Sequence, residues 1–200
     1  MFQRKTVVIS LLLASALSMP ALSQAQTPAP VAAGAATAPV LAGAAATPTA
    51  GAAAALSKAD HKVIVDMAMA NMAEVATGKM AVAKSQNPQV KAYAQKMVDE
   101  HTAAQADVTA LAQAKGVTMP ADLDAPHKSM AAKLDKLSGD AFDKAYMKNA
   151  GVSAHTKTHN KLVKASSKAK DPDVKAAATK MMPVVEQHLK LAKEQTAARK

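Results

Sequence analysis

The order of apolar and polar residues predicts helices from residue 57 onward. Apolar residues recur every three or four positions, as on one face of an α-helix, and no long alternation typical of a strand competes with them. The pattern divides into four long segments, expected at about 57–86, 87–115, 140–170 and 172–200. A shorter helix is expected around residues 130–137.

Start and stop signals set these boundaries. Residues that cap helix N-termini precede three of the long segments, and in two cases proline follows at the first helical position. Glycine, which favours helix ends, follows the second segment and interrupts the chain again before the third. The signals are Ser57 with Asp60, Asn87-Pro88, Gly116, Ser138-Gly139-Asp140 and Asp171-Pro172.

An internal repeat relates the second and fourth long helices. Residues 87–97 (NPQVKAYAQKM) resemble residues 171–181 (DPDVKAAATKM) at the same offset from the proline. The two helices are therefore expected to hold equivalent places in two helical hairpins. Short links within each hairpin and a longer link between them are typical of an all-α, antiparallel four-helix bundle, with the short helix between its second and third helices.

Each apolar face is interrupted by an ionisable residue that is expected to point inward. Glu74, His101 and His188 interrupt three faces, and either His155 or His159 interrupts the third helix, whose face is expected to run from Phe142 to Val163. At about 1.5 Å per residue, these groups fall at similar heights along the bundle. Glu186 is expected to lie partly inward at the same height. The sequence thus predicts a polar layer in the middle of the bundle.

The N-terminal quarter has a different character. Residues 1–25 combine a basic start, a short apolar run and small residues before Ala25, which is typical of a secretory signal peptide cleaved after Ala25. Residues 26–56 are uncharged, rich in alanine and broken by prolines, which predicts a disordered linker. The folded domain is expected at 57–200, and the mature protein in the periplasm.

Composition excludes several kinds of chemistry. The 200 residues contain no cysteine, which rules out disulfides, thiolate zinc sites and cysteine nucleophiles. Aromatic residues make up 2%, which argues against modules that stack nucleic-acid bases. The formal net charge of +10 falls to +8 when residues 1–25, with two basic residues, are removed. The basic surface is compatible with an anionic envelope surface as partner, and nucleic acid is not expected.

Three groups of residues carry a resemblance to a known family. They are residues 74–81 (EVATGKMA), residues 97–101 (MVDEH) after Asn87-Pro88, and residues 142–146 (FDKAY) with His155 and His188. Together they resemble the family called domain of unknown function 4142, across about residues 57–193. The resemblance implies a ferritin-like four-helix bundle in exported periplasmic or outer-membrane proteins, with no established activity.

The family's recurrent polar residues map onto particular positions of this chain. They correspond to Glu74, His101, Asp143, Tyr146, His155 and His188. The spacing from Tyr146 to Val152 is one residue longer than the family's pattern, which leaves open whether His155 or His159 faces inward.

The inward residues allow two interpretations. In the first, Glu74, His101, His155 or His159, and His188 bind a divalent transition metal such as Zn, Cu, Fe or Mn, with Glu186, Asp143 and Tyr146 in support. A carboxylate-bridged di-iron site is not expected, because no Glu-x-x-His occurs. In the second, no metal binds and a hydrogen-bonded polar layer fixes the register of the helices.

Other features point away from catalysis. No catalytic triad motif, nucleophile elbow or cofactor fingerprint occurs, so an enzyme is not favoured. Methionines at 67, 69, 72 and 80 are interpreted as core packing rather than as a soft-metal site. His61 and His127 are expected to be exposed. A metal-linked role in envelope stress and non-enzymatic binding to anionic lipid or polyanion remain the two functional hypotheses, with oligomeric state open.

Overall fold

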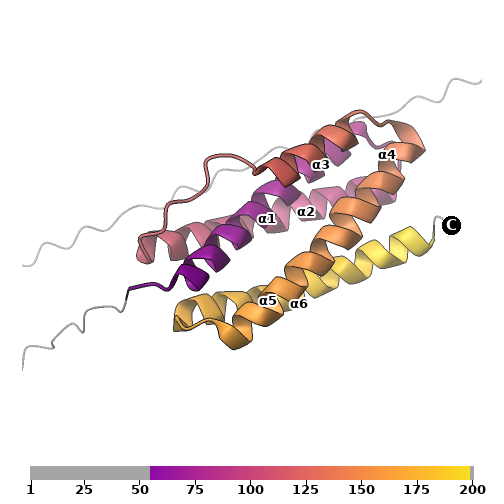
Figure 1. Ribbon diagram of the computed structural model, residues 1–200. Coiled ribbons are helices and arrows are strands. Elements are labelled where there is room, and N and C mark those ends of the chain that lie inside the picture. The colour runs from indigo at the N-terminus through magenta and orange to yellow at the C-terminus, as the bar shows by residue number, and fades with distance from the viewer. Residues whose placement is uncertain (1–54, 199–200) are drawn as a thin grey trace, which may run out of the picture. The chain divides into compact units, whose positions relative to one another are not determined.

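The computed structural model describes residues 55–198, and every regular element among them is a helix. The predicted signal peptide and all but the last two residues of the predicted linker lie outside the described residues. Figure 1 shows the helices in chain order. They are α1 (Lys58–Lys84), α2 (Pro88–Ala114), α3 (Ala125–Asp135), α4 (Gly139–Tyr146), the π-helix η1 (Met147–Ala154), α5 (His155–Lys168) and α6 (Pro172–Ala197).

The predicted start signals cap the helices as expected. The Ser57 hydroxyl accepts a hydrogen bond from the Asp60 amide at 3.1 Å and so begins α1. The side chains of Asn87 and Asp171 each accept bonds from two amides of the first turn that follows, at 2.9–3.2 Å. The repeated sequences therefore begin α2 and α6 in the same way. Gly116, at φ 65°, follows α2 in the left-handed conformation that glycine tolerates best.

Two hairpins form the bundle. α1 packs along α2, and the continuous helical run of α4, η1 and α5 packs along α6 (Figure 1). The first hairpin packs closely because Gly78 has no side chain. A Cβ there would lie 2.9 Å from Val98 Cγ2 and 3.1 Å from the Ala94 carbonyl oxygen. The short helix α3 contacts α1 and α4.

The third long helix differs from the prediction at its centre. It was expected to be a regular helix from about 140 to 170, but residues 147–154 adopt π-helical turns. A π-turn accommodates one extra residue, which accounts for the longer spacing from Tyr146 to Val152. The insertion also rotates the buried face that follows. Leu162 and Ala165 lie in the core, whereas Val163, predicted to face inward, is 46% exposed.

The apolar core consists of two clusters. One contains Ile64 and Val108 and extends to Leu162 and Val174, and the other contains Met97 and the aromatic side chains of Tyr93, Phe142 and Tyr146. Glu74, His101, His155 and His188 are buried polar residues that fall between the parts of their helices that contribute to the two clusters. The polar layer therefore lies in the middle of the bundle, as the sequence predicts.

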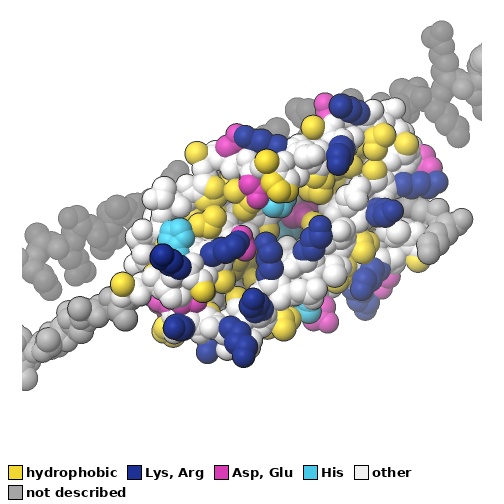
Figure 2. Space-filling view, viewed as in Figure 1, with side chains coloured by type: hydrophobic (Ala, Val, Ile, Leu, Met, Phe, Trp, Pro, Cys, Tyr) yellow, Lys and Arg dark blue, Asp and Glu magenta, His cyan; other side chains and the backbone are white. Residues whose placement is uncertain are grey.

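The surface is polar and the described part has no membrane span. No helix within residues 55–198 is long and apolar enough to cross a bilayer. Figure 2 shows lysines scattered over one face with acidic side chains between them. Several form ion pairs, such as Lys161 with Asp66 at 3.3 Å and Lys180 with Asp107 at 2.7 Å. Contact with an anionic envelope surface stays a prediction.

Asp60 holds the two hairpins together at one end of the bundle. Its carboxylate is 2% exposed and accepts hydrogen bonds from the amides of Lys170 and Asp171 at 3.1–3.2 Å. Asp60→Ala leaves two amides without this partner and is expected to lower the free energy of unfolding by about 2–6 kcal/mol, from about 1–3 kcal/mol for each lost partner. Urea denaturation measures this loss.

Asp66→Ala is the matched control on the same helix. Asp66 pairs with Lys62 and Lys161 at the surface, and such pairs contribute about 0–1 kcal/mol. Equal losses for the two variants would contradict a special role for Asp60.

Candidate metal centre

Three histidines from three helices meet in the polar layer. His101 lies in the middle of α2, His155 is the first residue of α5, and His188 lies in the second half of α6. Their side chains are 4%, 1% and 0% exposed. One ring nitrogen from each lies within 4.8 Å of those from the other two, and the ring centroids are 5.3–5.6 Å apart. We call these residues the histidine triad.

Each imidazole of the triad is held by an oxygen acceptor on one nitrogen. The three bonds are His101 Nδ1 to Asn71 Oδ1 at 2.9 Å, His155 Nδ1 to the Ala150 carbonyl oxygen at 3.0 Å, and His188 Nε2 to Glu100 Oε2 at 2.6 Å. Since a carbonyl or carboxylate oxygen can only accept, the bonded nitrogen carries the proton. The other nitrogen of each neutral ring then presents a lone pair.

Two of these lone pairs face each other, and the third is buried in the same cluster of rings. His101 Nε2 lies 3.4 Å from His155 Nε2, and His188 Nδ1 is buried without a hydrogen-bond partner. Two unprotonated nitrogens at this separation gain nothing from each other, and a buried orphan acceptor is unfavourable. A metal ion between the rings would satisfy all three, and the oxygen acceptors would fix the ring orientations as outer-shell partners do in histidine metal sites.

Burial keeps the triad neutral. Burial, together with the neighbouring His155 and His188, lowers the pKa of His101 to about 3. Burial likewise lowers the pKa of His155 to about 4, against a smaller opposing effect of its backbone hydrogen bonds. The pKa of His188 is lowered by burial too, although its bond to Glu100 works in the opposite direction. The rings are therefore electrically neutral at pH 7, with one nitrogen of each unprotonated, and this is the form that binds metal.

The π-helix positions His155. Ala150 lies within η1, five residues before His155, and its carbonyl accepts the Nδ1 proton. Gly151 lets α6 approach this segment, because a Cβ there would lie 3.0 Å from Ala192 Cβ. The π-turns thus supply both the acceptor and the rotation that brings His155 inward. His159, the alternative left open by the sequence, is half-buried and lies outside the triad.

Glu74 lies beside the triad rather than in it. Its side chain is 7% exposed, and its Oε1 is 3.7 Å from His155 Nδ1, the nitrogen that bonds to Ala150. Burial raises the pKa of Glu74 to about 8. Its other oxygen, Oε2, is buried without a hydrogen-bond partner. Glu74 therefore faces the back of His155, away from the nitrogen that faces His101.

Of the three residues predicted to support the metal ligands, two are buried and one is exposed. Tyr146 and Asp143 are buried on α4, where Tyr146 stacks on Phe142 with centroids 6.1 Å apart. Burial, with Glu74 and Tyr93 nearby, raises the pKa of Tyr146 well above its usual value. Glu186 was predicted to lie partly inward, but it is exposed. Val185 and His188 form the inward face of α6 and turn Glu186 to solvent.

Sequence reasoning missed the three oxygen acceptors. Asn71 lies one turn before Glu74 and is completely buried, so the helical period could have identified it. Glu100 is more exposed and precedes His101 directly, and only the packing of α2 against α6 brings it to His188. The Ala150 carbonyl is a backbone group, and no side-chain pattern marks it.

Comparison with known proteins identifies the family. A family model described as "Domain of unknown function (DUF4142)" matches residues 45–194. The chain belongs to the DUF4142 family. This confirms the resemblance seen in the sequence. No curated protein matches this DUF4142 chain significantly.

Two solved structures have a similar fold. One is the "Crystal structure of DUF305 fragment from Deinococcus radiodurans", with a TM-score of 0.64 and 10% identity over 72% of this chain and 98% of that chain. The other is "CopM in the Cu(II)-bound form", with a TM-score of 0.58 and 16% identity over 70% of this chain and 96% of that chain. At these identities the likeness shows a shared helical fold.

The buried ionisable groups predict a stability maximum near pH 6.5 for the metal-free protein. Unfolded histidines bind protons below about 6.5, whereas folded His101 and His155 do so only near 3 and 4. Stability is therefore lost as pH falls below 6.5, at up to about 1.4 kcal/mol per pH unit for each histidine. Glu74 has the opposite effect on stability, because its raised pKa makes the free energy of unfolding fall as pH rises from 4.5 to about 8.

Urea denaturation in a chelating buffer between pH 5 and 8 tests this expectation. His101 and His155 together outweigh Glu74, so the free energy of unfolding should fall by about 1 kcal/mol from pH 6.5 to 5. Glu74→Gln should remove the decline above pH 6.5 and make the decline on the acid side steeper. A stability that stays constant between pH 5 and 6.5 would show that the triad histidines titrate normally.

Proposed function

We propose that this DUF4142 protein binds one transition-metal ion through His101 Nε2, His155 Nε2 and His188 Nδ1. The observation that carries the proposal is the arrangement of the three rings. Each has one nitrogen held by an oxygen acceptor; the other nitrogens of His101 and His155 lie 3.4 Å apart, and Nδ1 of His188, whose ring is 5.3 Å from both of theirs, is buried without a hydrogen-bond partner. Three neutral imidazoles with fixed tautomers are a ligand set for Zn, Cu, Fe or Ni.

Copper is the metal we propose first. Nitrogen ligands bind Cu²⁺ more tightly than the other divalent ions of the first transition row. The similar fold of CopM, a protein described in a Cu(II)-bound form, supports the same choice. The triad offers three protein ligands, which leaves a position open for water or for a ligand that removes the ion. We therefore propose binding and transfer of the ion rather than catalysis.

We further propose that the protein acts in the periplasm and that its helices form a ferritin-like, antiparallel four-helix bundle. The signal-like residues 1–25 support export, and a metal-binding role in envelope stress would fit that location. The two hairpins and the longer link through α3 support the bundle topology. The folded domain proposed here is residues 57–200, after the linker.

Titration of the metal-free full chain, prepared without a histidine tag, tests the proposal. We expect one Cu²⁺ or Zn²⁺ ion per chain at the triad in competition with a chromophoric chelator. His101→Ala, His155→Ala and His188→Ala should each weaken binding by more than the about 10–100-fold typical of losing an outer-shell partner. His159→Ala is the matched control, because this half-buried histidine of α5 lies outside the triad, and it should leave the affinity unchanged.

The same variants distinguish the metal site from a purely hydrogen-bonded layer. In such a layer, wild type would take up no metal, and the triad substitutions would change only the free energy of unfolding. That result would contradict the proposed function. Circular dichroism establishes that each variant is folded before its affinity is compared with that of wild type.

Glu100 is expected to act through His188. Its carboxylate accepts the Nε2 proton of His188 at 2.6 Å and so keeps Nδ1 free for the metal. Glu100→Ala should weaken metal binding about 10–100-fold while the stoichiometry stays at one. Glu100→Gln retains an acceptor oxygen and should restore most of the affinity. Equal affinities for wild type and Glu100→Ala would show that Glu100 does not orient the ring.

A further inference from the structure

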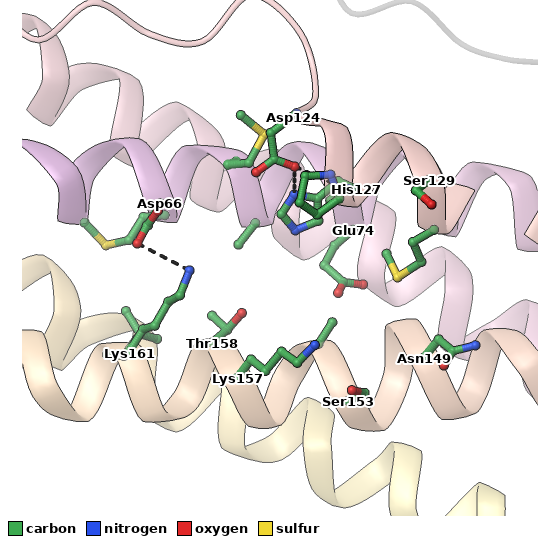
Figure 3. A pocket seen from close by; sticks show the side chains of 18 of the residues that line it. Asp66, Glu74, Asp124, His127, Ser129, Asn149, Ser153, Lys157, Thr158 and Lys161 are labelled. Carbon is green, nitrogen blue, oxygen red and sulfur yellow. Dashed lines mark hydrogen bonds and ion pairs between the residues drawn. The ribbon is translucent and has the colours of Figure 1, made fainter. Parts of the chain in front are cut away.

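A groove opens on the side of the bundle next to the triad. It has a volume of about 520 Å³ and lies between α1, α3 and the run formed by η1 and α5 (Figure 3). The triad itself is almost completely buried, so an ion needs a route to it. Glu74 lines the groove, and its carboxyl group points into it.

The rim of the groove gathers three kinds of metal-binding side chain. Asp124 and His127 come from the start of α3, and Asp124 Oδ1 lies 2.5 Å from His127 Nδ1. The sulfur of Met69, on α1, accepts the Asp124 amide at 3.3 Å. All three residues line the groove. The sequence predicted an exposed His127, but it is half-buried because Asp124 holds it against this wall.

His127 is oriented to offer a ligand atom. The carboxylate of Asp124 accepts the Nδ1 proton, which leaves Nε2 of the neutral ring as an acceptor. This carboxylate–imidazole pair resembles the arrangement that orients histidines at metal sites. Met69 adds a thioether and Asp124 a second carboxylate oxygen. Thioether with imidazole is a soft ligand set that favours copper, especially Cu⁺, over hard ions such as Mg²⁺ or Ca²⁺.

Glu74 connects the groove with the triad. Its Oε2 is buried in the groove floor without a hydrogen-bond partner, and its Oε1 is 3.7 Å from His155 Nδ1. A buried carboxyl oxygen without a donor is unfavourable unless a ligand pairs with it. Glu74 Oε1 lies next to Nδ1 of His155, on the opposite side of the imidazole ring from the nitrogen that faces His101.

The charges around the groove favour a soft ion. Lys157 and Lys161 line the wall formed by α5, and Lys161 pairs with Asp66 at 3.3 Å. These cations offset the nearby carboxylates, so ions that bind through charge alone are held weakly. An ion that forms partly covalent bonds to sulfur and nitrogen depends less on this balance.

We propose that the groove is a second copper site that loads the triad: Met69, Asp124 and His127 take up Cu⁺ at the rim, and Glu74 receives it on the floor. Delivery of the ion to the histidine triad rests on the proposed function. Binding at the rim does not depend on it. The ion keeps its oxidation state throughout, and Glu74, which burial keeps protonated in the metal-free protein, releases its proton to water when it binds the ion.

Nuclear magnetic resonance of the full chain tests the rim site directly. With methyl-labelled methionine, addition of Ag⁺ as a redox-inert probe for Cu⁺ should shift the Met69 methyl signal and the His127 ring signals. Met69→Leu identifies the methyl signal by its loss. The shifts should persist in His188→Ala, because the rim site does not use the triad. Met69 and His127 signals that do not respond to Ag⁺ would overturn the proposal.

Loading kinetics test the route. Under anaerobic, reducing conditions, Cu⁺ uptake into the triad should slow at least about tenfold in Met69→Leu with His127→Gln, a loss comparable to that of an outer-shell partner. The equilibrium affinity of the triad for Cu⁺ in this double variant should equal that of wild type. Glu74→Gln should slow uptake while the rim shifts remain. The matched control is Met72→Leu with His61→Gln, which changes the same residue types on α1 away from the groove and should load at the wild-type rate.

The outcomes separate the two proposals. Normal triad affinity with unchanged loading in the rim variants overturns the groove as a route and leaves the proposed function intact. Ag⁺ shifts at the rim with no metal bound by the triad overturn the proposed function and the loading role together. Rim shifts with slowed loading and unchanged triad affinity support the whole scheme.

Discussion

The burial of three neutral imidazoles in one layer is the constraint on which the rest of this structure depends. Apolar clusters fill the bundle on both sides of the layer, and the rings are shielded from bulk water. Each ring therefore needs a protein partner, and Asn71, Ala150 and Glu100 supply one each. These partners come from α1, η1 and α2, which fixes the register of the hairpins as well as the orientation of the rings.

The π-helix shows how a local irregularity serves this layer. A regular third helix would keep the phase of Phe142 and carry Val163 inward instead of Leu162. The extra residue in η1 rotates the following turn, so that His155 enters the core and the Ala150 carbonyl faces its Nδ1. π-Turns in helices are frequent at functional sites, and here the irregularity lies directly beside the candidate ligand.

Charge is arranged differently inside and at the surface. The triad and Glu74 are held neutral by burial, whereas the lysines of α5 and α6 pair with acidic side chains in water. The interior layer is thus suited to bind a cation through lone pairs, and the basic exterior does not attract one by charge. Selectivity for a nitrogen- or sulfur-binding metal follows from this division, because hard ions are bound mainly by charge.

The sequence by itself determined the helices, their caps and the residues that would meet near the middle of the bundle. These features depend on local hydrogen bonds and on the helical period, and both can be recognised from neighbouring residues in the sequence. His101 and His188 could be named from their places on apolar faces. The family could be recognised from its short motifs. The sequence could not choose between His155 and His159, because that choice depends on the phase change in η1. Nor could it place Glu100 against His188, put Glu74 behind the ring of His155, or bring Met69 to Asp124 and His127. These contacts join helices that are distant along the chain, and only their packing decides which side chains come within bonding distance.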